Sequence, residues 1–303
     1  MRRLSGYNPA CHSNHLTMKK ENSCPTPNGT LLIVGGHEDK TGIPETKVQK
    51  ANYHPLEVLR TFIELTGKKQ PAIELITTAS SAGEETFADY EAAFRELALP
   101  VPGHIHHDKR TDVRDPDLSA RLKNADGVFF TGGDQLKLTS LYGGTELLYI
   151  LKQRYIGDGL VLAGTSAGAM AMSTPMIFAG NKESQQLTGE VKVTTGLEFL
   201  KDVCIDTHFV DRGRFVRMAQ VIATNPTCIG LGIEEDTAVT IKNGNELEVI
   251  GSGTVIIIDG FQISDSNILE YGTGKTISIQ DLNVKLLAKG DRYRIPRMNP
   301  PHL

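Results

Sequence analysis

The chain contains 303 residues, 39% of them hydrophobic and 22% charged, and it carries a formal net charge of −4. This length and apolar content are enough for one large or two small domains with a sizeable core. The lack of a basic stripe argues against a nucleic-acid partner, and four cysteines without a C-x-x-C pair indicate free thiols in a reducing compartment, which predicts a cytoplasmic protein.

The first 28 residues form a polar segment rich in Asn, Ser and Lys. They include no apolar run of the length that a signal peptide or membrane anchor requires, so we expect no membrane partner. We therefore expect residues 1–28 to be a disordered tail and residues 29–303 to form a single domain.

Short apolar strands alternate with amphipathic helices over the next two thirds of the chain. The pattern predicts strands at 31–34, 73–77, 128–131 and 160–163, and helices at 55–66, 84–97, 134–141, 146–155 and 212–223. Such alternation is typical of a mostly parallel sheet covered on both faces, a three-layer α/β/α sandwich. From Cys228 onward, strands at 229–233, 238–241, 247–250 and 254–258 are separated by Asn-Gly and Gly-Ser-Gly turns. These predict hairpins added to the sheet, and hence a β-rich C-terminal portion.

The most informative segment is Gly164-Thr165-Ser166-Ala167-Gly168, which joins an apolar strand to an Ala/Met helix. Strand, sharp turn and helix with a serine at the turn are the layout of a nucleophile elbow. The alternative is a tight turn whose serine only caps the following helix. In the elbow interpretation the oxyanion hole combines the N–H groups of Ala167 and of Gly133, which follows the strand at 128–131. The open alternative for Gly132-Gly133 is a plain strand-to-helix turn.

A nucleophilic serine needs a base and an orienting carboxylate. His208 and Glu235 both lie directly after apolar strands, where catalytic side chains of α/β sheets collect. An α/β-hydrolase has the chain order serine, acid, histidine. Here the only histidine after Glu235 is His302 near the C-terminus, so the order serine, histidine, acid is the more credible one.

Two other patterns give weaker signals. His104, His106 and His107 lack a nearby carboxylate or cysteine with a ligand-like spacing, and Gly35-Gly36 matches neither the dinucleotide nor the P-loop fingerprint. We therefore predict no metal and no cofactor.

Five motifs in this order resemble the cyanophycinases, serine exopeptidases related to the aspartyl dipeptidase called peptidase E. They are Gly35-Gly36-His37-Glu38-Asp39-Lys40, Thr131-Gly132-Gly133-Asp134-Gln135, Gly164-Thr165-Ser166-Ala167-Gly168-Ala169, Asp206-Thr207-His208-Phe209-Val210-Asp211-Arg212-Gly213-Arg214-Phe215-Val216-Arg217 and Gly232-Ile233-Glu234-Glu235-Asp236-Thr237-Ala238. The resemblance implies a peptidase E or class I glutamine amidotransferase-like fold and a homodimer. It implies hydrolysis of cyanophycin, a poly-aspartate with arginine on each side-chain carboxylate, to β-aspartyl-arginine through an acyl-enzyme.

The resemblance also assigns roles to individual residues. It makes Ser166 the nucleophile, His208 the base and Glu235 the orienting acid, and it implies a pocket lined by Gln135, Asp206, Thr207, Arg212, Arg214 and Arg217. Thr207 departs from the family, which has glutamine there. Arginines bind carboxylates in a bidentate manner, so Arg214 and Arg217, three residues apart, suit the carboxylates of the substrate. Asp134 or Asp206 suits its guanidinium, and the open alternative is that either acid is a turn or cap residue.

Three alternatives stay open at this point. The arginines could belong to a solvated helix face, since arginine side chains are mostly exposed. The enzyme could be a peptidase E-like dipeptidase for aspartyl or isoaspartyl peptides. An inactive relative that binds acidic or arginine-rich peptides is the third, because a fold does not fix a function.

Overall fold

A computed structural model describes residues 25–42, 53–180 and 185–296. Most of the predicted tail, residues 1–24, lies outside the described residues, as do Cys11, Cys24 and His302. At the start of the described chain, Asn28 donates hydrogen bonds to the carbonyl oxygens of Ile156 and Gly157, at 3.0 and 2.9 Å.

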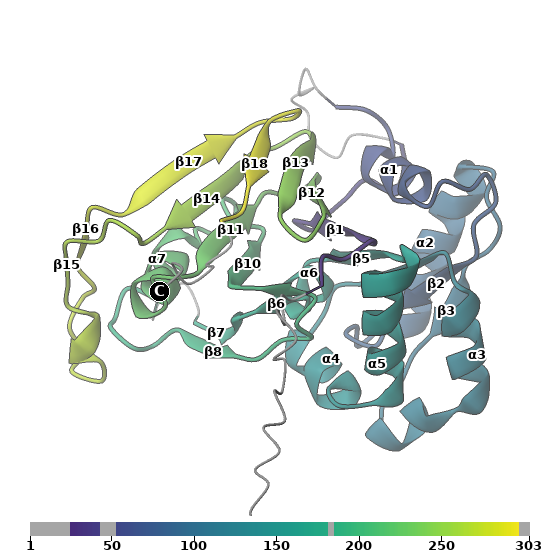
Figure 1. The fold of residues 1–303 in the computed structure, drawn as a ribbon, viewed down its shortest axis with the longest axis horizontal. Helices are drawn as coiled ribbons and strands as arrows, with labels where there is room; N and C mark the ends of the chain where they lie inside the picture. The colour runs from purple at the N-terminus through teal and green to yellow at the C-terminus, as the bar shows by residue number, and fades with distance from the viewer. Residues whose placement is uncertain (1–24, 43–52, 181–184, 297–303) are drawn as a thin grey trace, which may run out of the picture.

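The larger sheet has eight strands in the order β18-β13-β12-β1-β5-β4-β2-β3 (Figure 1). The five strands from β1 to β3 in this order are mutually parallel, whereas β12, β13 and β18 continue the sheet in antiparallel pairs. The bounds are β1 (Thr30–Val34), β2 (Ile73–Ile76), β3 (Gly103–Ile105), β4 (Gly127–Phe130), β5 (Val161–Thr165), β12 (Thr237–Lys242), β13 (Glu246–Gly251) and β18 (Arg292–Arg294). The predicted α/β fold is confirmed, with the parallel part built from the alternating segments.

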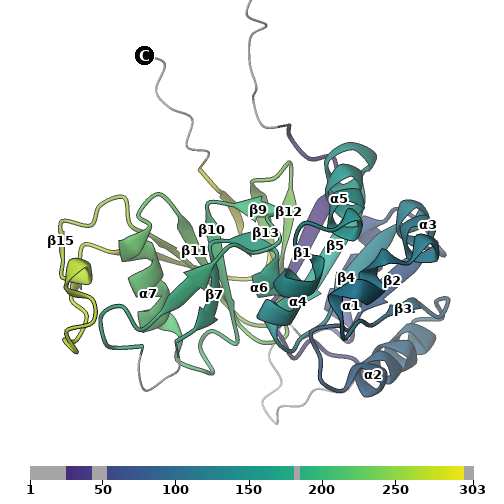
Figure 2. The same ribbon diagram turned by 90° about the horizontal axis from the view of Figure 1, so that it is seen from below.

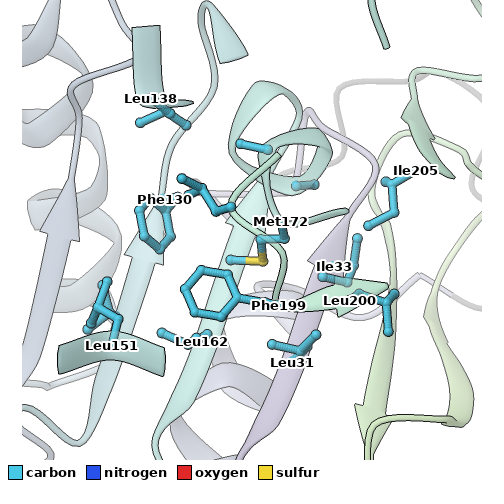
Figure 3. Packing of buried hydrophobic residues seen from close by; sticks show 14 of the residues in the cluster. Leu31, Ile33, Phe130, Leu138, Leu151, Leu162, Met172, Phe199, Leu200 and Ile205 are labelled. Atoms are coloured by element: carbon cyan, nitrogen blue, oxygen red, sulfur yellow. The ribbon is translucent and has the colours of Figure 1, made fainter. Parts of the chain in front are cut away.

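Helices cover both faces of this sheet because successive strand residues point to opposite sides. On β1, Leu32 and Val34 pack in one cluster with α1 (Glu57–Leu65) and α2 (Gly83–Glu96). Leu31 and Ile33 belong to the cluster on the other side, with α3 (Pro116–Asn124), α4 (Gln135–Tyr142) and α5 (Glu146–Gln153) (Figure 3). The near-continuous apolar strands are therefore buried on both faces.

A second sheet of six strands, in the order β17-β14-β11-β10-β6-β9, was not predicted. It places β11 and β14 away from the larger sheet, while only β12 and β13 form the hairpin added to it. Helix α7 (Phe215–Thr224) packs Met218 and Ile222 against its outer face, at one end of the molecule in Figure 2. The bounds are β6 (Ser173–Thr174), β9 (Leu200–Lys201), β10 (Val203–Thr207), β11 (Ile229–Ile233), β14 (Val255–Asp259) and β17 (Asn283–Leu287).

The remaining elements are short. Helix α6 (Ala167–Ala171) follows β5, and the two small hairpins pair β7 (Met176–Ala179) with β8 (Lys192–Thr194) and β15 (Asp265–Ser266) with β16 (Ile279–Gln280). Turns of other helix types are η1 (Arg110–Arg114), η2 (Arg154–Asp158) and η3 (Ile268–Glu270). Across the part of the chain that the structure covers, no helix has the length and apolar character needed to cross a membrane.

Candidate active site

Ser166 lies at the turn between β5 and α6, with φ 50° and ψ −117°. A non-glycine residue in this conformation is strained, as a nucleophile elbow requires. The turn is tight because Gly164 and Gly168 face each other: a Cβ on Gly164 would lie 2.7 Å from the Gly168 carbonyl carbon. The serine side chain makes no capping hydrogen bond, so the interpretation of Ser166 as a simple helix cap does not fit the structure.

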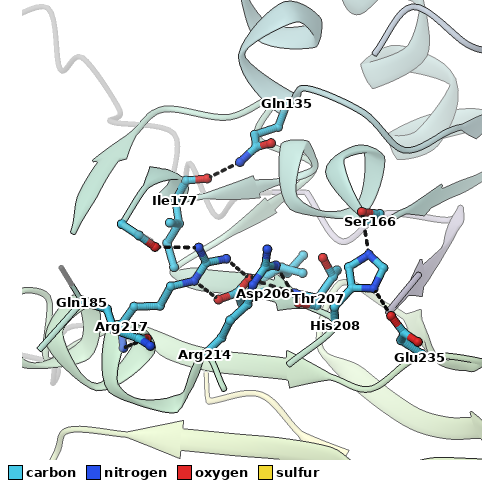
Figure 4. Close-up of polar contacts among 12 residues, drawn as sticks. Gln135, Ser166, Ile177, Gln185, Asp206, Thr207, His208, Arg214, Arg217 and Glu235 are labelled. Carbon is cyan, nitrogen blue, oxygen red and sulfur yellow. Dashed lines mark hydrogen bonds and ion pairs between the residues drawn. The ribbon is translucent and has the colours of Figure 1, made fainter. Parts of the chain in front are cut away.

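A continuous chain of hydrogen bonds links three of the predicted site residues (Figure 4). Ser166 Oγ lies 2.9 Å from His208 Nε2, and His208 Nδ1 lies 2.5 Å from Glu235 Oε1. These residues follow β5, β10 and β11, so two sheets contribute to one site. The assignment of Nδ1 as the protonated nitrogen follows from its carboxylate partner, which can only accept.

Gly35 and Gly36, which directly follow β1, contact His208 and the residue after Glu235. His208 donates its backbone N–H to the carbonyl oxygen of Gly35 at 2.8 Å, and Asp236 donates to that of Gly36 at 2.9 Å. Gly36 has φ 101°, and a Cβ there would lie 2.3 Å from Cε1 of His208. The Gly35-Gly36 pair is therefore required by the close approach of the imidazole.

The electrostatics of the site favour a neutral imidazole. Burial lowers the pKa of His208 to about 4, with the positive charges of Arg212, His37 and Arg214 acting in the same direction and Glu38 against them. Burial raises the pKa of Glu235, and its hydrogen bond with the carboxyl group of Asp211 does the same. At neutral pH, Nε2 of His208 is thus free to accept a proton from the serine.

The glycine turn after β4 lies against Ser166. A Cβ on Gly132 would be 3.3 Å from the Cβ of Ser166, and one on Gly133, at φ 139°, would be 2.0 Å from the carbonyl oxygen of Ala79. Ala167 is the first residue of α6, where backbone N–H groups have no acceptor within the helix. Both predicted oxyanion donors therefore belong to segments next to Ser166.

Asp206 forms a buried ion cluster with two of the predicted arginines (Figure 4). Its side chain is 0% exposed and accepts from Arg217 Nε at 2.5 Å, from Arg214 at 2.9 Å and from the N–H of Thr207 at 2.9 Å, with a further bond from Arg217. Arg217 also donates to the carbonyl oxygen of Gly180 at 3.1 Å, so each of its three guanidinium nitrogens has a protein acceptor.

These contacts change two of our expectations. Arg217 is only 8% exposed, which contradicts a solvated helix face, and its engaged guanidinium does not reach for a substrate carboxylate as predicted. Asp206 is already neutralised by the protein's own arginines and is not an open acceptor for a substrate guanidinium. The helix also begins at Phe215, three residues later than predicted, because residues 211–213 form a turn in which Gly213 has φ 60°.

The other predicted pocket residues have different surroundings. Gln135 opens α4 and donates to the carbonyl oxygen of Ile177 at 2.8 Å. Arg212 is exposed, while Arg214 also donates to the carbonyl oxygen of Thr207 at 2.7 Å. Thr207 is fully buried, and its hydroxyl has no hydrogen-bond partner among the described residues.

Sequence reasoning gave no role to Glu38, although it lies in one of the motifs. Its buried carboxylate accepts a hydrogen bond from Thr165 Oγ1 at 2.5 Å and another from the hydroxyl of Tyr90. Lys40 lies 3.6 Å from the same carboxylate. Glu38 therefore holds the residue that precedes the serine, and an acidic residue just after a strand was the signal that could have revealed it.

The histidines of the weaker metal pattern bind protein groups. His104 Nε2 and His106 Nδ1 contact Thr77 Oγ1 at 2.7 and 2.9 Å, and His107 Nδ1 contacts the Tyr142 hydroxyl at 3.0 Å. Within the described ranges, the one group of three side chains close enough to share a metal ion is His37, His208 and Glu235.

Comparison with known proteins gives a consistent result. The model of peptidase family S51 matches residues 45–249. A cyanophycinase of a Nostoc species is 32% identical over 273 residues, covering 89% of this chain and 88% of the relative. Those of Synechococcus elongatus and Geminocystis herdmanii are 31% and 30% identical, covering 88% and 87% of this chain and 79% and 93% of theirs.

The fold has a solved counterpart in a peptidase from an acI-B1 actinobacterium. That structure aligns with a TM-score of 0.62 at 19% identity, over 89% of this chain and 98% of the other. Together with the family match, this shows that the chain is a peptidase of family S51, in which the named cyanophycinases are its relatives.

Proposed function

We propose that this peptidase is a serine exopeptidase that hydrolyses cyanophycin and releases β-aspartyl-arginine. The observation that carries the proposal is the hydrogen-bonded series from Ser166 Oγ through His208 to Glu235, with the serine on a strained elbow. The cyanophycinases that are 30–32% identical over most of the chain support the substrate.

In the proposed mechanism, Ser166 Oγ attacks the carbonyl carbon of a backbone peptide bond while His208 Nε2 accepts its proton. The pair is already at hydrogen-bonding distance, 2.9 Å. The imidazolium that forms keeps its Nδ1–H on Glu235, which stabilises the charge, and Nε2 then protonates the leaving amine. In the second half, water attacks the acyl-enzyme while His208 Nε2 accepts its proton. Nε2 then returns a proton to Ser166 Oγ, and the product leaves with a free carboxylate.

The tetrahedral oxyanion is held by backbone N–H groups of Ala167 and Gly133. Both belong to segments in contact with the serine, one opening α6 and one in the turn after β4. Two such donors aimed at the developing charge contribute more in the transition state than in the ground state.

The substrate's charged groups need partners of opposite charge that the protein leaves available. Arg212 is exposed, and within the described part of the chain Arg214 donates through one terminal nitrogen, Nη1, so these two arginines suit the free carboxylates. Asp134 is exposed beside Gln135; its Oδ1 accepts the N–H of Leu136 as the N-cap of α4, and its other carboxylate oxygen suits the guanidinium. Arg217 does not bind the substrate itself in this proposal. It holds Asp206, and Asp206 positions Arg214.

The proposal is tested by incubating the enzyme with purified cyanophycin, poly-aspartate and short aspartyl or isoaspartyl peptides, and identifying the products by mass. We expect β-aspartyl-arginine from cyanophycin and little action on poly-aspartate, because an acidic group left without its arginine partner lowers the rate. Preferential cleavage of the unbranched peptides would instead support a dipeptidase of the peptidase E type.

We also propose that the enzyme is a cytoplasmic homodimer, as the family resemblance implies. Light scattering after size-exclusion chromatography measures the oligomeric state, and fractionation of the source cells measures the compartment. A monomer at micromolar concentration would contradict the first statement.

A further inference from the structure

The site holds a group of donors that the proposed hydrolysis does not use as a unit. His37 follows β1, and one donor atom each from His37, His208 and Glu235 lies within 4.8 Å of the other two. His37 Nδ1 is 3.9 Å from Glu235 Oε2, and its ring meets that of His208 edge to face with centroids 5.1 Å apart. No role in the hydrolytic steps falls to His37.

Two imidazoles and one carboxylate are the donor set of an open zinc site, in which water completes the coordination. We propose that His37 Nδ1, His208 Nδ1 and Glu235 form an inhibitory site for a divalent transition-metal ion of the zinc type. Magnesium and calcium are excluded as ligands of choice, since they prefer oxygen donors.

The spacing is close to what such an ion needs. Zinc–nitrogen and zinc–oxygen bonds of about 2.0–2.2 Å place tetrahedral ligands about 3.3–3.5 Å apart. His37 Nδ1 and Glu235 Oε2, at 3.9 Å, must approach by about half an ångström. His208 Nδ1 and Glu235 Oε1, at 2.5 Å, must separate by about 1 Å to admit the ion between them.

Access and local charge permit this insertion. The side chain of His37 is 57% exposed and that of Glu235 is 28% exposed, so the ion enters from solvent and keeps water on its open side. Asp211, which is hydrogen-bonded to Glu235, adds a second carboxyl group nearby, whereas Arg212 is the neighbouring cation that opposes binding.

Binding at Nδ1 has a defined chemical consequence for catalysis. The neutral imidazole of His208 carries one hydrogen, which in the free enzyme is on Nδ1 toward Glu235. When zinc takes the lone pair of Nδ1, that hydrogen moves to Nε2 by exchange with solvent, and no net proton is released. Nε2 then donates to Ser166 and has no lone pair to accept its proton, so the nucleophile is not activated.

The binding test does not depend on activity. Isothermal titration with ZnCl2 should detect the site in the wild-type chain and equally in Ser166→Ala, whose zinc ligands are intact. His37→Gln should lose at least about tenfold in zinc affinity, because even outer partners of metal ligands contribute tenfold or more. His54→Gln is the matched control, since His54 is an exposed histidine outside the cluster.

The inhibition test rests on the proposed function. The rate of each variant on cyanophycin in ZnCl2 is divided by its own rate in EDTA, with MgCl2 as the control cation. Zinc should inhibit the wild type and His54→Gln and lose most of its effect on His37→Gln. Equal zinc affinity in His37→Gln and the wild type would overturn the site, and bound zinc without inhibition would overturn the tautomer argument. A chain that binds zinc at this site but does not cleave cyanophycin would refute the proposed function alone.

Discussion

Replacing Asp206 by asparagine separates a structural role of this residue from a role in binding substrate. Asp206 is 0% exposed and pairs with Arg217 and Arg214, whose side chains are 9% and 15% exposed. Asp206→Asn keeps the shape and removes the negative charge. The two arginines are then left with an uncompensated positive charge in a buried environment.

Breaking a buried ion pair on one side destabilises a protein by about 3–5 kcal/mol. With an unfolding entropy of about 2.1 cal/mol/K per residue, 1 kcal/mol changes the melting temperature of a 303-residue chain by about 1.6 °C. We therefore expect the melting temperature of Asp206→Asn to fall by about 5–8 °C.

Differential scanning calorimetry at one fixed scan rate measures this shift, with kcat and KM on cyanophycin determined below the transition. Asp202→Asn is the matched control, because it removes the same charge from an exposed aspartate just before the same strand. An Asp206→Asn variant that melts within about 1 °C of the wild type but has a raised KM would refute our reasoning and return Asp206 to the substrate pocket.

Three further substitutions and the pH profile of the wild type test other parts of the site. Ser166→Ala should lower kcat by about 10⁴-fold or more with an unchanged melting temperature, because triad members act as a unit; single-turnover product analysis measures it. Gly36→Ala places a Cβ 2.3 Å from the His208 ring, so kcat should fall by about 10²-fold, as expected for a displacement of about 1 Å; retained activity would contradict the close approach. Glu38→Gln should shift the acid limb of kcat/KM to lower pH, because the negative charge of Glu38 raises the pKa of His208; an unmoved profile would leave Glu38 with a purely structural role. In the wild type, the lowered pKa of His208 means that the base loses its proton below the ordinary histidine range, so kcat/KM should rise with pH through about 4 and be flat by neutrality.

The sequence predicted those parts of the candidate site whose residues lie within short local motifs. The serine lies between an apolar strand and small residues, His208 directly follows β10, and Glu235 is the second residue after β11. Small neighbours mark an elbow and catalytic groups gather at strand ends, so the sequence placed Ser166 and His208 together, and the structure has them at hydrogen-bonding distance.

The parts that were missed depend on which strands pair. Nothing in the local pattern distinguishes β11 and β14, which form a second sheet, from β12 and β13, which extend the first. Likewise, the spacing of Arg214 and Arg217 predicts a shared helix face but not that a buried carboxylate on β10 lies beneath it. Such partners come from tertiary packing, which overrides the expectation that arginines are exposed.

Unfavourable backbone dihedral angles are concentrated at the candidate site. Among the described residues that are not glycine, ten have positive φ, and four of these are His37, Ser166, His208 and Asp236, with φ between 47° and 50°. These four residues follow β1, β5, β10 and β11, whose C-terminal ends carry the residues of the candidate site. Each such conformation is unfavourable by about 1–3 kcal/mol and persists only where its surroundings enforce it. Here the enforcing contacts are the backbone hydrogen bonds from Ser166 to Val34, from His208 to Gly35 and from Asp236 to Gly36. The exit of β1 thus fixes Ser166, His208 and Asp236 together, which explains how two separate sheets hold one hydrogen-bonded series in register.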